Sequence, residues 1–262
     1  MKKADTLKEI VQKKKERILL AKQAISEEEL RLKVQGLPPA RPFIEAIHKP
    51  RTLNLIAEIK KASPSAGIIC PAFNPVEIAK IYQEAGAAAI SVLTEEDYFQ
   101  GNLAYINEVK NVAAVPVLRK DFILEPYQVY ESRFYGADAI LLIADILTKE
   151  KIVELMQVAD SLGLDYLVEV HDEKELKKVL NCKAPVIGIN NRDLHTLQVD
   201  FKTTEKLFPL IPKDKAVVVE SGIKSSQDVL FLKILGVSAV LIGSAFMEAA
   251  DVKSKVEELM GW

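Results

Sequence analysis

Two charged residues of opposite sign, Glu58 and Lys60, stand at the end of the apolar segment 53–60. They are two positions apart, so on a β-strand their side chains point to the same face. Because an unpaired charge is costly to bury, we expect this acid and this amine to pair with each other or to meet a charged ligand. A turn-forming sequence, Ser-Pro-Ser-Ala-Gly, follows directly.

Polar residues also end seven later apolar segments. They are Thr94 and Glu95, Lys120 and Asp121, Asp145, Glu169 and His171, Asn190 and Arg192, Glu220 and Ser221, and Gly243 and Ser244. Side-chain alternation, counted from Leu118 and Leu167, places Lys120 and Glu169 on inner faces. Asp121 then faces the other way, which predicts a cap or a structural partner. We interpret His171 as a loop residue rather than a base.

Eight short apolar segments must position these residues, and we predict each to be a strand: 53–60, 88–94, 115–120, 138–144, 165–170, 185–190, 216–221 and 238–243. Helical segments separate them, and the strands lack strict alternation, as parallel strands buried on both faces do. The pattern predicts an α/β fold, a single (β/α)8 TIM barrel with additional N-terminal helices. A doubly wound open sheet is the alternative, weakened because no Gly-rich fingerprint follows the first strand.

The ends of the last two strands carry small residues that suit an anion. In a barrel the polar strand ends meet at one mouth, and the loops after strands seven and eight are a frequent phosphate site. The sequences ESGI (220–223) and IGSAFM (242–247) lie there. We predict that Ser221, Gly222, Gly243 and Ser244 bind a phosphate, largely through backbone amides. The alternative is that both glycines only allow tight turns.

The first 50 residues precede the predicted barrel. Leu7, Ile10, Val11 and Ile18 recur at roughly helical spacing among basic residues, which predicts an amphipathic helix packed on the domain rather than a targeting segment. The Pro-rich stretch 36–43 joins this region to the barrel. We therefore expect one domain, residues 1–262, with residues 1–50 as a helical extension.

Composition excludes several classes of function. The formal net charge of −2 argues against nucleic-acid binding. No apolar run approaches the ~20 residues that span a bilayer. The three histidines lack ligand spacing, so we predict no metal site, and the two cysteines form no ligand or disulfide pattern. With no signal peptide visible, we expect a cytoplasmic protein.

With these motifs in hand, the chain resembles the indole-3-glycerol phosphate synthase family of tryptophan biosynthesis. The resemblance rests on IAEIKKASPSAG, ISVLTEEDYFQG, VLRKDFILEPYQV, GADAILLIADIL, LVEVHDEKEL, IGINNRDL, VVVESGI and VLIGSAFM, and on LKEIVQKKKERI as the family's additional helix. Ala66 departs from it, because many members carry a basic residue there. The chain stops after the eighth unit, so we expect no fusion to the next barrel enzyme of the pathway.

The resemblance implies a ring closure that needs no cofactor. A carboxyphenylamino-deoxyribulose phosphate closes to indole-3-glycerol phosphate with loss of CO2 and water. The implied catalytic residues are Lys120, Glu169, Lys60, Glu58, Asn190 and Glu220. Lys120 is the first general acid, and Glu169 is a base or the residue that orients Lys120. Lys60 holds the substrate carboxylate, Glu58 keeps Lys60 charged, and Asn190 and Glu220 bind the reacting hydroxyls.

The implied binding residues are Ser63, Phe99, Phe122, Leu142, Arg192, Ser221, Gly222, Gly243 and Ser244. Phe99, Phe122 and Leu142 are expected to form an apolar wall for the aromatic ring, although core packing would explain each equally well. Which of Lys60 and Lys120 performs each acid step stays open.

Two other functions stay open at this point. A Schiff-base aldolase acting on a sugar phosphate would use Lys60 or Lys120 as its nucleophile. A non-catalytic scaffold would not need the polar set at the mouth. For partners we expect only the phosphorylated small molecule, with no nucleic acid or membrane, and a monomer or weak homo-oligomer.

Overall fold

The computed structural model describes residues 6–261, and within them eight parallel strands close a barrel. Around the barrel the order is β1-β10-β9-β8-β7-β6-β5-β4, and β4 pairs with β1. The strands are β1 Asn54–Ile59, β4 Ala89–Leu93, β5 Val117–Lys120, β6 Ala139–Ile143, β7 Asp165–Val170, β8 Val186–Asn190, β9 Ala216–Glu220 and β10 Ala239–Ile242. The predicted TIM barrel is confirmed.

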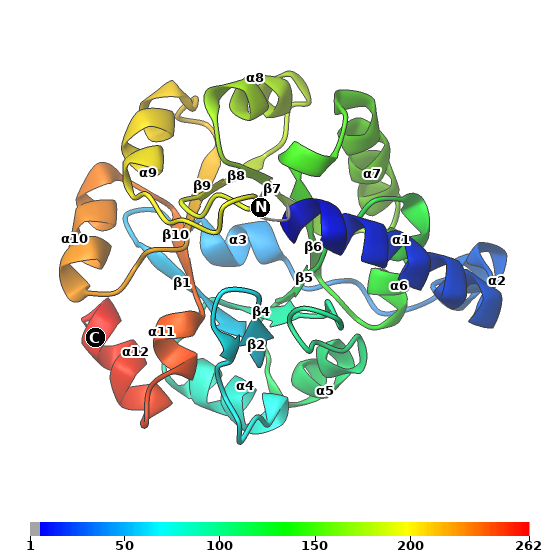
Figure 1. The fold of residues 1–262 in the computed structure, drawn as a ribbon, viewed down its shortest axis with the longest axis horizontal. Coiled ribbons are helices and arrows are strands. Elements are labelled where there is room, and N and C mark those ends of the chain that lie inside the picture. The colour runs from blue at the N-terminus through cyan, green and yellow to red at the C-terminus, as the bar shows by residue number, and fades with distance from the viewer. Residues whose placement is uncertain (1–5, 262) are drawn as a thin grey trace, which may run out of the picture.

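Helices surround the barrel, as Figure 1 shows. They are α4 Pro75–Glu84, α5 Ala104–Val112, α6 Pro126–Phe134, α7 Lys149–Ser161, α8 Glu173–Asn181, α9 Lys202–Leu207, α10 Ser226–Leu235, α11 Ser244–Met247 and α12 Val252–Met260, with the short 3-10 turns η1 Ala144–Ile146 and η2 Phe208–Leu210. Side chains cap several helix starts: Asn74 accepts two amides of α4, and Ser225 forms a capping box with Asp228 at α10.

Inward and outward side chains alternate along each strand. Inside the barrel, Ile56, Leu118, Leu167 and Val218 belong to one buried cluster. The outward residues of the same strands pack against the helices in two further clusters. Both faces of each strand are therefore apolar, which explains the continuous apolar segments of the sequence.

The predicted strands are right in place; 165–170 matches β7, and the other seven are one or two residues too long. For example, 115–120 begins at Val117, after Pro116, whose nitrogen has no proton to donate. One element was not predicted: β2 Ala62–Ser63 and β3 Gly67–Ile68 form a small antiparallel hairpin in the segment after β1. Its turn is the Ser-Pro-Ser-Ala-Gly sequence, and Gly67 takes the positive φ of 67° that the turn requires.

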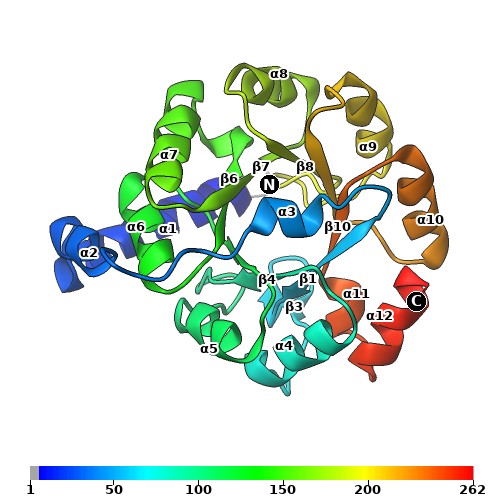
Figure 2. The same ribbon diagram turned by 180° about the vertical axis from the view of Figure 1, so that it is seen from behind.

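The chain before β1 contacts both ends of the barrel. Its helices are α1 Thr6–Ala24, α2 Glu27–Lys33 and α3 Phe43–Ile47. In Figure 1, α1 lies across the rim of the barrel, and Figure 2 shows α3 across the opposite end. Leu7 and Ile10 of α1 and Phe43 and Ile47 of α3 join the cluster inside the barrel. The predicted N-terminal helix is confirmed from Thr6 onward, and residues 1–5 lie outside the described residues.

A buried ion-pair network fastens α1 to the barrel. Lys14 is 3% exposed, and its Nζ lies 2.9 Å from Asp121 Oδ1 and 3.4 Å from Glu96 Oε2. Asp121 also accepts from Thr94 at 2.6 Å and from Arg119 at 3.0 Å. The prediction that Asp121 has a structural role is consistent with these contacts. Since Asp121 directly follows Lys120, the network holds the backbone that carries Lys120.

None of the helices within residues 6–261 combines the length and the apolar character needed to cross a bilayer.

Replacing Lys14 with Met should lower the free energy of unfolding by about 3 kcal/mol, because it removes one of the two cations that pair with the buried Asp121 and breaks the ion pair with Glu96. Lys13→Met is the matched control, since Lys13 is half exposed and pairs with Glu16 on its own helix. The control should cost less than about 0.5 kcal/mol. Urea unfolding of both variants measures the difference; equal losses would show that the buried network does not hold α1.

Candidate active site

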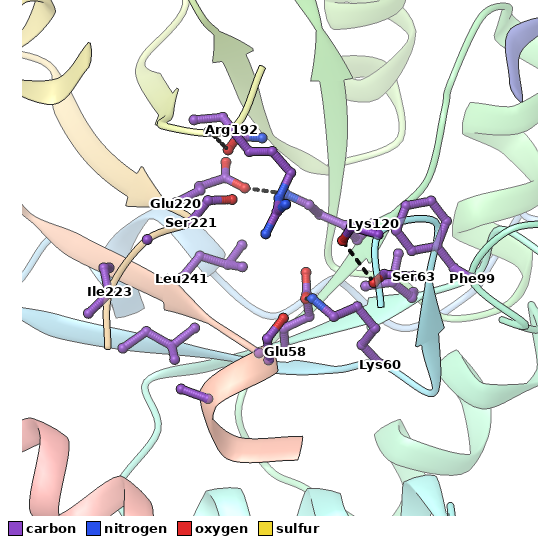
Figure 3. Close-up of a pocket in the computed structure, with 18 of the residues that line it drawn as sticks. Glu58, Lys60, Ser63, Phe99, Lys120, Arg192, Glu220, Ser221, Ile223 and Leu241 are labelled. Atoms are coloured by element: carbon purple, nitrogen blue, oxygen red, sulfur yellow. Dashed lines mark hydrogen bonds and ion pairs between the residues drawn. The ribbon is translucent and has the colours of Figure 1, made fainter. Parts of the chain in front are cut away.

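A cavity of about 840 Å3 opens at the C-terminal mouth of the barrel. Its lining includes the predicted residues Glu58, Lys60, Ser63, Phe99, Lys120, Phe122, Glu169, Asn190, Arg192, Glu220, Ser221, Gly222, Gly243 and Ser244. Figure 3 shows several of them converging on this space from opposite sides of the barrel. Of the fifteen predicted site residues, only Leu142 lies elsewhere.

Four charged residues, three buried glutamates and the partly buried Lys120, come from alternate strands. Glu58 lies on β1, Lys120 on β5, Glu169 on β7 and Glu220 on β9. Side chains of alternate strands form one layer in this type of barrel, and bulky apolar residues usually fill it. Here the layer is charged, and its members must be paired or contact a ligand.

Lys120 is held between two carboxylates. Its Nζ lies 3.2 Å from Glu169 Oε2 and also pairs with Glu220 Oε2. Burial alone would lower the pKa of Lys120, but the charges of Glu220, Glu169 and Glu58 outweigh it and raise the pKa well above its usual value. Lys120 is therefore a stable ammonium group, positioned to donate a hydrogen bond into the cavity.

Glu58 and Lys60 form the pair that their spacing predicts. Lys60 Nζ lies 2.6 Å from Glu58 Oε1, and Glu58 is buried while Lys60 borders the cavity. The predicted shared face is confirmed. Figure 3 shows this pair across the cavity from Glu220 and Arg192. The site thus presents two separate ammonium groups, each oriented by carboxylates.

The two carboxylates that bind Lys120 differ in acidity. Burial would raise the pKa of Glu169, but Lys120, His171 and Asn190 outweigh burial and hold it well below its usual range. Burial raises the pKa of Glu220 to about 7, and Glu169 and Glu58 add to the effect, while Lys120 opposes it. Such divergence between neighbouring carboxyls is typical of acid/base sites.

One oxygen of Glu220 is left open. Its Oε1 is buried and has no hydrogen-bond partner among the described residues. A Cβ atom at Gly188, on the neighbouring strand β8, would lie 2.7 Å from this oxygen. The absence of a side chain at Gly188 therefore makes room for Glu220, and Oε1 is a buried acceptor without a partner, which is uncommon in a folded protein.

Asn190 is the last residue of β8, and Arg192 lies two positions after it. Asn190 Nδ2 donates to Glu169 Oε1 at 3.1 Å, and its Oδ1 accepts the Arg192 amide at 3.0 Å. The Arg192 guanidinium donates to the Leu197 carbonyl at 3.0 Å and lines the cavity. Arg192 thus contacts the backbone of the mouth and borders the cavity, and its binding of a ligand stays a prediction.

The apolar wall differs from the prediction in one residue. Phe99 and Phe122 line the cavity with their ring centroids 6.3 Å apart. Leu142 does not, because it faces outward into the cluster under the helices. The prediction for Leu142 was wrong; its neighbours Leu141 and Ile143 line the cavity instead. The predicted strand 138–144 is apolar on both faces, so its sequence does not show which side chains point into the barrel.

The small residues of the predicted phosphate loops have distinct structural reasons. Ser221 and Gly222 both take positive φ values, 64° and 84°, in the turn after β9. A non-glycine residue there is strained, and such strain concentrates at functional sites. Gly243 has an ordinary φ, but a Cβ atom at this position would lie 2.9 Å from Glu58 Cβ and collide with the Glu58 carboxylate. Gly243 therefore makes room for Glu58 as well as for a ligand.

Two contacts in the site were not predicted. Glu95 accepts the amides of Asp97, Tyr98 and Phe99, and so holds the loop that carries Phe99. His171 does lie just after β7, as expected, but its Nε2 is 3.2 Å from Glu169 Oε1. The signal was present in the sequence, since residues two apart share a strand face.

The acidic group Glu95, Glu96 and Asp97 has the spacing of a possible cation site. However, each carboxylate already has partners: backbone amides for Glu95, Lys14 for Glu96 and Arg17 for Asp97. The pKa of Asp97 is lowered, first by its hydrogen bond from Arg17. These contacts account for the group as part of the anchor of α1.

The comparison with known proteins decides the family. A model described as "Indole-3-glycerol phosphate synthase" matches residues 7–259. The chain belongs to the indole-3-glycerol phosphate synthase family. The proteins of that name from Desulforamulus reducens and Caldanaerobacter subterraneus are 47% and 49% identical to it. Each alignment covers 97% of this chain, with 96% and 99% of the respective relative. The resemblance inferred from the motifs is confirmed.

Solved structures with similar folds are more distant in sequence. The 3-hexulose-6-phosphate synthase of Salmonella typhimurium has a TM-score of 0.66 at 15% identity, over 80% of this chain and 97% of its own. A tryptophan synthase alpha-subunit of Pyrococcus furiosus has a TM-score of 0.61 at 16% identity, over 82% of this chain and 100% of its own. At these identities the likeness concerns the fold alone.

The raised pKa of Glu220 predicts a pH-dependent stability. Between about pH 4.5 and 7 the folded protein binds more protons at this group than the unfolded chain does, so its contribution to stability falls as the pH rises. Glu220→Gln removes the titration. The free energy of unfolding of the variant minus that of the wild type should therefore increase by roughly 1–3 kcal/mol from pH 5 to pH 8. Urea unfolding at both pH values measures it; a constant or decreasing difference would contradict the raised pKa.

Gly243→Ala should lower kcat by at least about tenfold, because the new Cβ displaces Glu58 and with it Lys60. Steady-state kinetics separates this effect from phosphate binding. A rise in KM at unchanged kcat would assign Gly243 to the phosphate alone. As a control, a melting temperature near that of the wild type shows that the variant is folded.

Proposed function

We propose that the chain closes the indole ring of indole-3-glycerol phosphate at this mouth by general acid/base catalysis, as the indole-3-glycerol phosphate synthase family does in tryptophan biosynthesis. In that reaction the ring carbon that bears the carboxylate attacks the ketone of a carboxyphenylamino-deoxyribulose phosphate. CO2 and then water leave. The observation that supports the proposal best is the pair of ammonium groups, Lys60 and Lys120, each oriented by buried carboxylates in one cavity.

The first proposed step needs an acid at the ketone oxygen. Lys120 takes this role, because its ammonium group borders the cavity and is oriented by Glu169 and Glu220. Protonating the oxygen as the carbon–carbon bond forms prevents an alkoxide from building up in a dry site. Lys60 binds the substrate carboxylate until CO2 departs, and Glu58 holds the Lys60 ammonium group in place.

The later steps remove a ring proton and expel hydroxide. Glu169 accepts the proton or orients Lys120, and either lysine supplies the acid for the leaving hydroxide. Asn190 and Glu220 bind the reacting hydroxyls, with the open Glu220 Oε1 as the group that supports this contact. Phe99, Phe122, Leu141 and Ile143 contact the aromatic ring.

The phosphate is proposed to lie at the loops after β9 and β10. Ser221, Gly222, Gly243 and Ser244 line that side of the cavity, and Lys224 lines it too. Ser63, in the hairpin after β1, and Arg192 complete the contacts with the substrate's polar groups. No cofactor takes part in this scheme.

The finer points of context are also proposals. We place the protein in the cytoplasm; the free thiols of Cys70 and Cys182 suit a reducing compartment. We expect a monomer or weak homo-oligomer, which sedimentation measures directly. Residues 1–50 belong to the same domain as the barrel, an assignment supported by the packing of Leu7, Ile10 and Phe43 inside it.

A Schiff-base aldolase that uses Lys120 is disfavoured by the charges around this residue. An amine nucleophile must lose its proton, and the carboxylates around Lys120 raise its pKa instead of lowering it. Borohydride should therefore trap no covalent adduct between Lys120 and the substrate.

Lys120→Ala should lower kcat by about 10²–10⁴-fold, the usual contribution of a general acid. The assay follows the rise in indole fluorescence after the carboxyphenylamino substrate is added, with and without EDTA. A wild-type protein that gives no rise in indole fluorescence would overturn the proposed function. A loss of less than threefold in the variant would remove Lys120 from the mechanism.

A further inference from the structure

His171 joins a catalytic carboxylate to a structural one. Its Nε2 lies 3.2 Å from Glu169 Oε1, and its Nδ1 lies 3.2 Å from Glu175 Oε2. The side chain is 13% exposed, so little water competes for either contact. An imidazole between two carboxylates can donate to both only when both of its nitrogens carry a proton.

Glu175 is itself held firmly. It lies in the first turn of α8, where its amide donates to Asp172 Oδ1 at 2.8 Å. Its Oε2 also accepts the His171 backbone amide at 2.8 Å. The positive end of the helix dipole stabilises a carboxylate at this position. His171 is therefore attached to a fixed point outside the cavity.

The surroundings of Glu169 also favour a cation at His171. Glu169 is buried, and its Oε1 accepts from the neutral amide of Asn190. A protonated His171 places a positive charge 3.2 Å from this oxygen. Burial would lower the pKa of His171, but Glu169 and Glu175 outweigh burial and raise it to about 10.

The two oxygens of Glu169 contact different residues. Oε1 lies 3.2 Å from His171 Nε2 and accepts from Asn190, while Oε2 faces Lys120. Without His171, only the neutral amide of Asn190 would hold Oε1, and the carboxylate would be free to turn both oxygens toward Lys120. Lys120 would then be bound more tightly and would be a poorer acid.

We propose that His171 is a positioning residue, an imidazolium that links Glu169 to Glu175 and fixes the Glu169 carboxylate in the orientation that proton transfer requires. This inference rests on the proposed role of Glu169. It assigns His171 no contact with the substrate. Its effect should therefore appear in kcat rather than in KM.

The kinetic test compares His171→Asn with His48→Asn. His48 is exposed at the opposite end of the barrel, where Nδ1 bonds Ser238 Oγ, so it is a matched control. His171→Asn should lower kcat about tenfold, the usual effect of losing a polar contact with a charged group, with KM changed less than about twofold. The control should leave both constants unchanged.

The pH profile supplies a readout that a purely structural role would not move. Removing a cation raises the pKa of Glu169, so kcat of His171→Asn should fall at a higher pH on acidification than kcat of the wild type. The other charged groups that act on Glu169 or on its partners, Lys120, Glu220, Glu58 and Glu175, are the same in both proteins. An unshifted profile with an unchanged kcat would overturn the inference.

Nitrogen NMR of the imidazoles tests the charge directly and needs no substrate. The chain has three histidines, so the spectra of His171→Asn and His48→Asn assign all three signals. The His171 signal should remain that of an imidazolium at pH 8. A neutral ring at that pH would refute the proposal.

Glu175→Gln provides a second variant in case His171→Asn does not fold. It keeps the shape and the backbone contact but removes one of the two carboxylates, so the His171 signal should titrate at a lower pH than in the wild type.

Glu169→Gln separates the proposed catalytic role of Glu169 from the proposed positioning role of His171. If it leaves kcat intact, the proposed role of Glu169 fails; if it abolishes turnover while His171→Asn has no effect, only the present inference fails.

Discussion

The ion pairs of Lys120 with Glu169 and Glu220 are the interaction around which the mouth of this barrel is arranged. The three residues come from β5, β7 and β9, so the pairs exist only when the barrel is closed and its strands are in register. Replacing apolar side chains with charges in this layer removes core packing and requires full pairing in its place. The fold supplies the pairing, and the result is a set of charges whose positions are determined before a substrate arrives. Such preorganisation is the main source of electrostatic catalysis.

A second set of charges supports the same strand from outside. Arg119 and Asp121 flank Lys120 in sequence, and alternation sends them to the outer side of β5. There they meet Glu131 of α6 and Lys14 of α1 at 2.9 Å each. Arg119 is 2% exposed, so this network too is buried. The end of β5 is thus held by ion pairs on both of its faces, which restricts the movement of the Lys120 backbone.

The sequence predicts this site correctly where a strand carries a polar residue, because that residue shows which side chains of the strand point into the barrel. On β5 and β7 the charged ends stand two residues after an inward leucine, and the predictions for Lys120 and Glu169 place them correctly in the cavity. On β6 every residue is apolar, and the choice of Leu142 over Leu141 had no such guide. The hairpin β2–β3 was missed because two-residue strands leave no periodicity.

Contacts between distant segments were beyond sequence reasoning for a different reason. Lys14 looks like one basic residue among many in a charged helix, and only the packing of α1 against Asp121 singles it out. The role of Glu95 likewise depends on a loop conformation that no local pattern specifies. His171 was within reach, since it stands two residues from Glu169, but its partner Glu175 becomes visible only when the start of α8 is known.

The path of the N-terminal segment has a consequence for how the protein is made. The amides of Arg41 and Ile44 donate to Asp138 and Asp165, at 2.6 and 2.9 Å, at the starts of β6 and β7. Phe43 and Ile47 close an end of the barrel that includes strands as late as β10. During synthesis on the ribosome, the N-terminal segment therefore emerges before the strands that it contacts. Asp165, for example, emerges more than a hundred residues after Ile44. Until then its apolar side chains stay exposed, and we expect this delay to make the nascent chain depend on protection from aggregation.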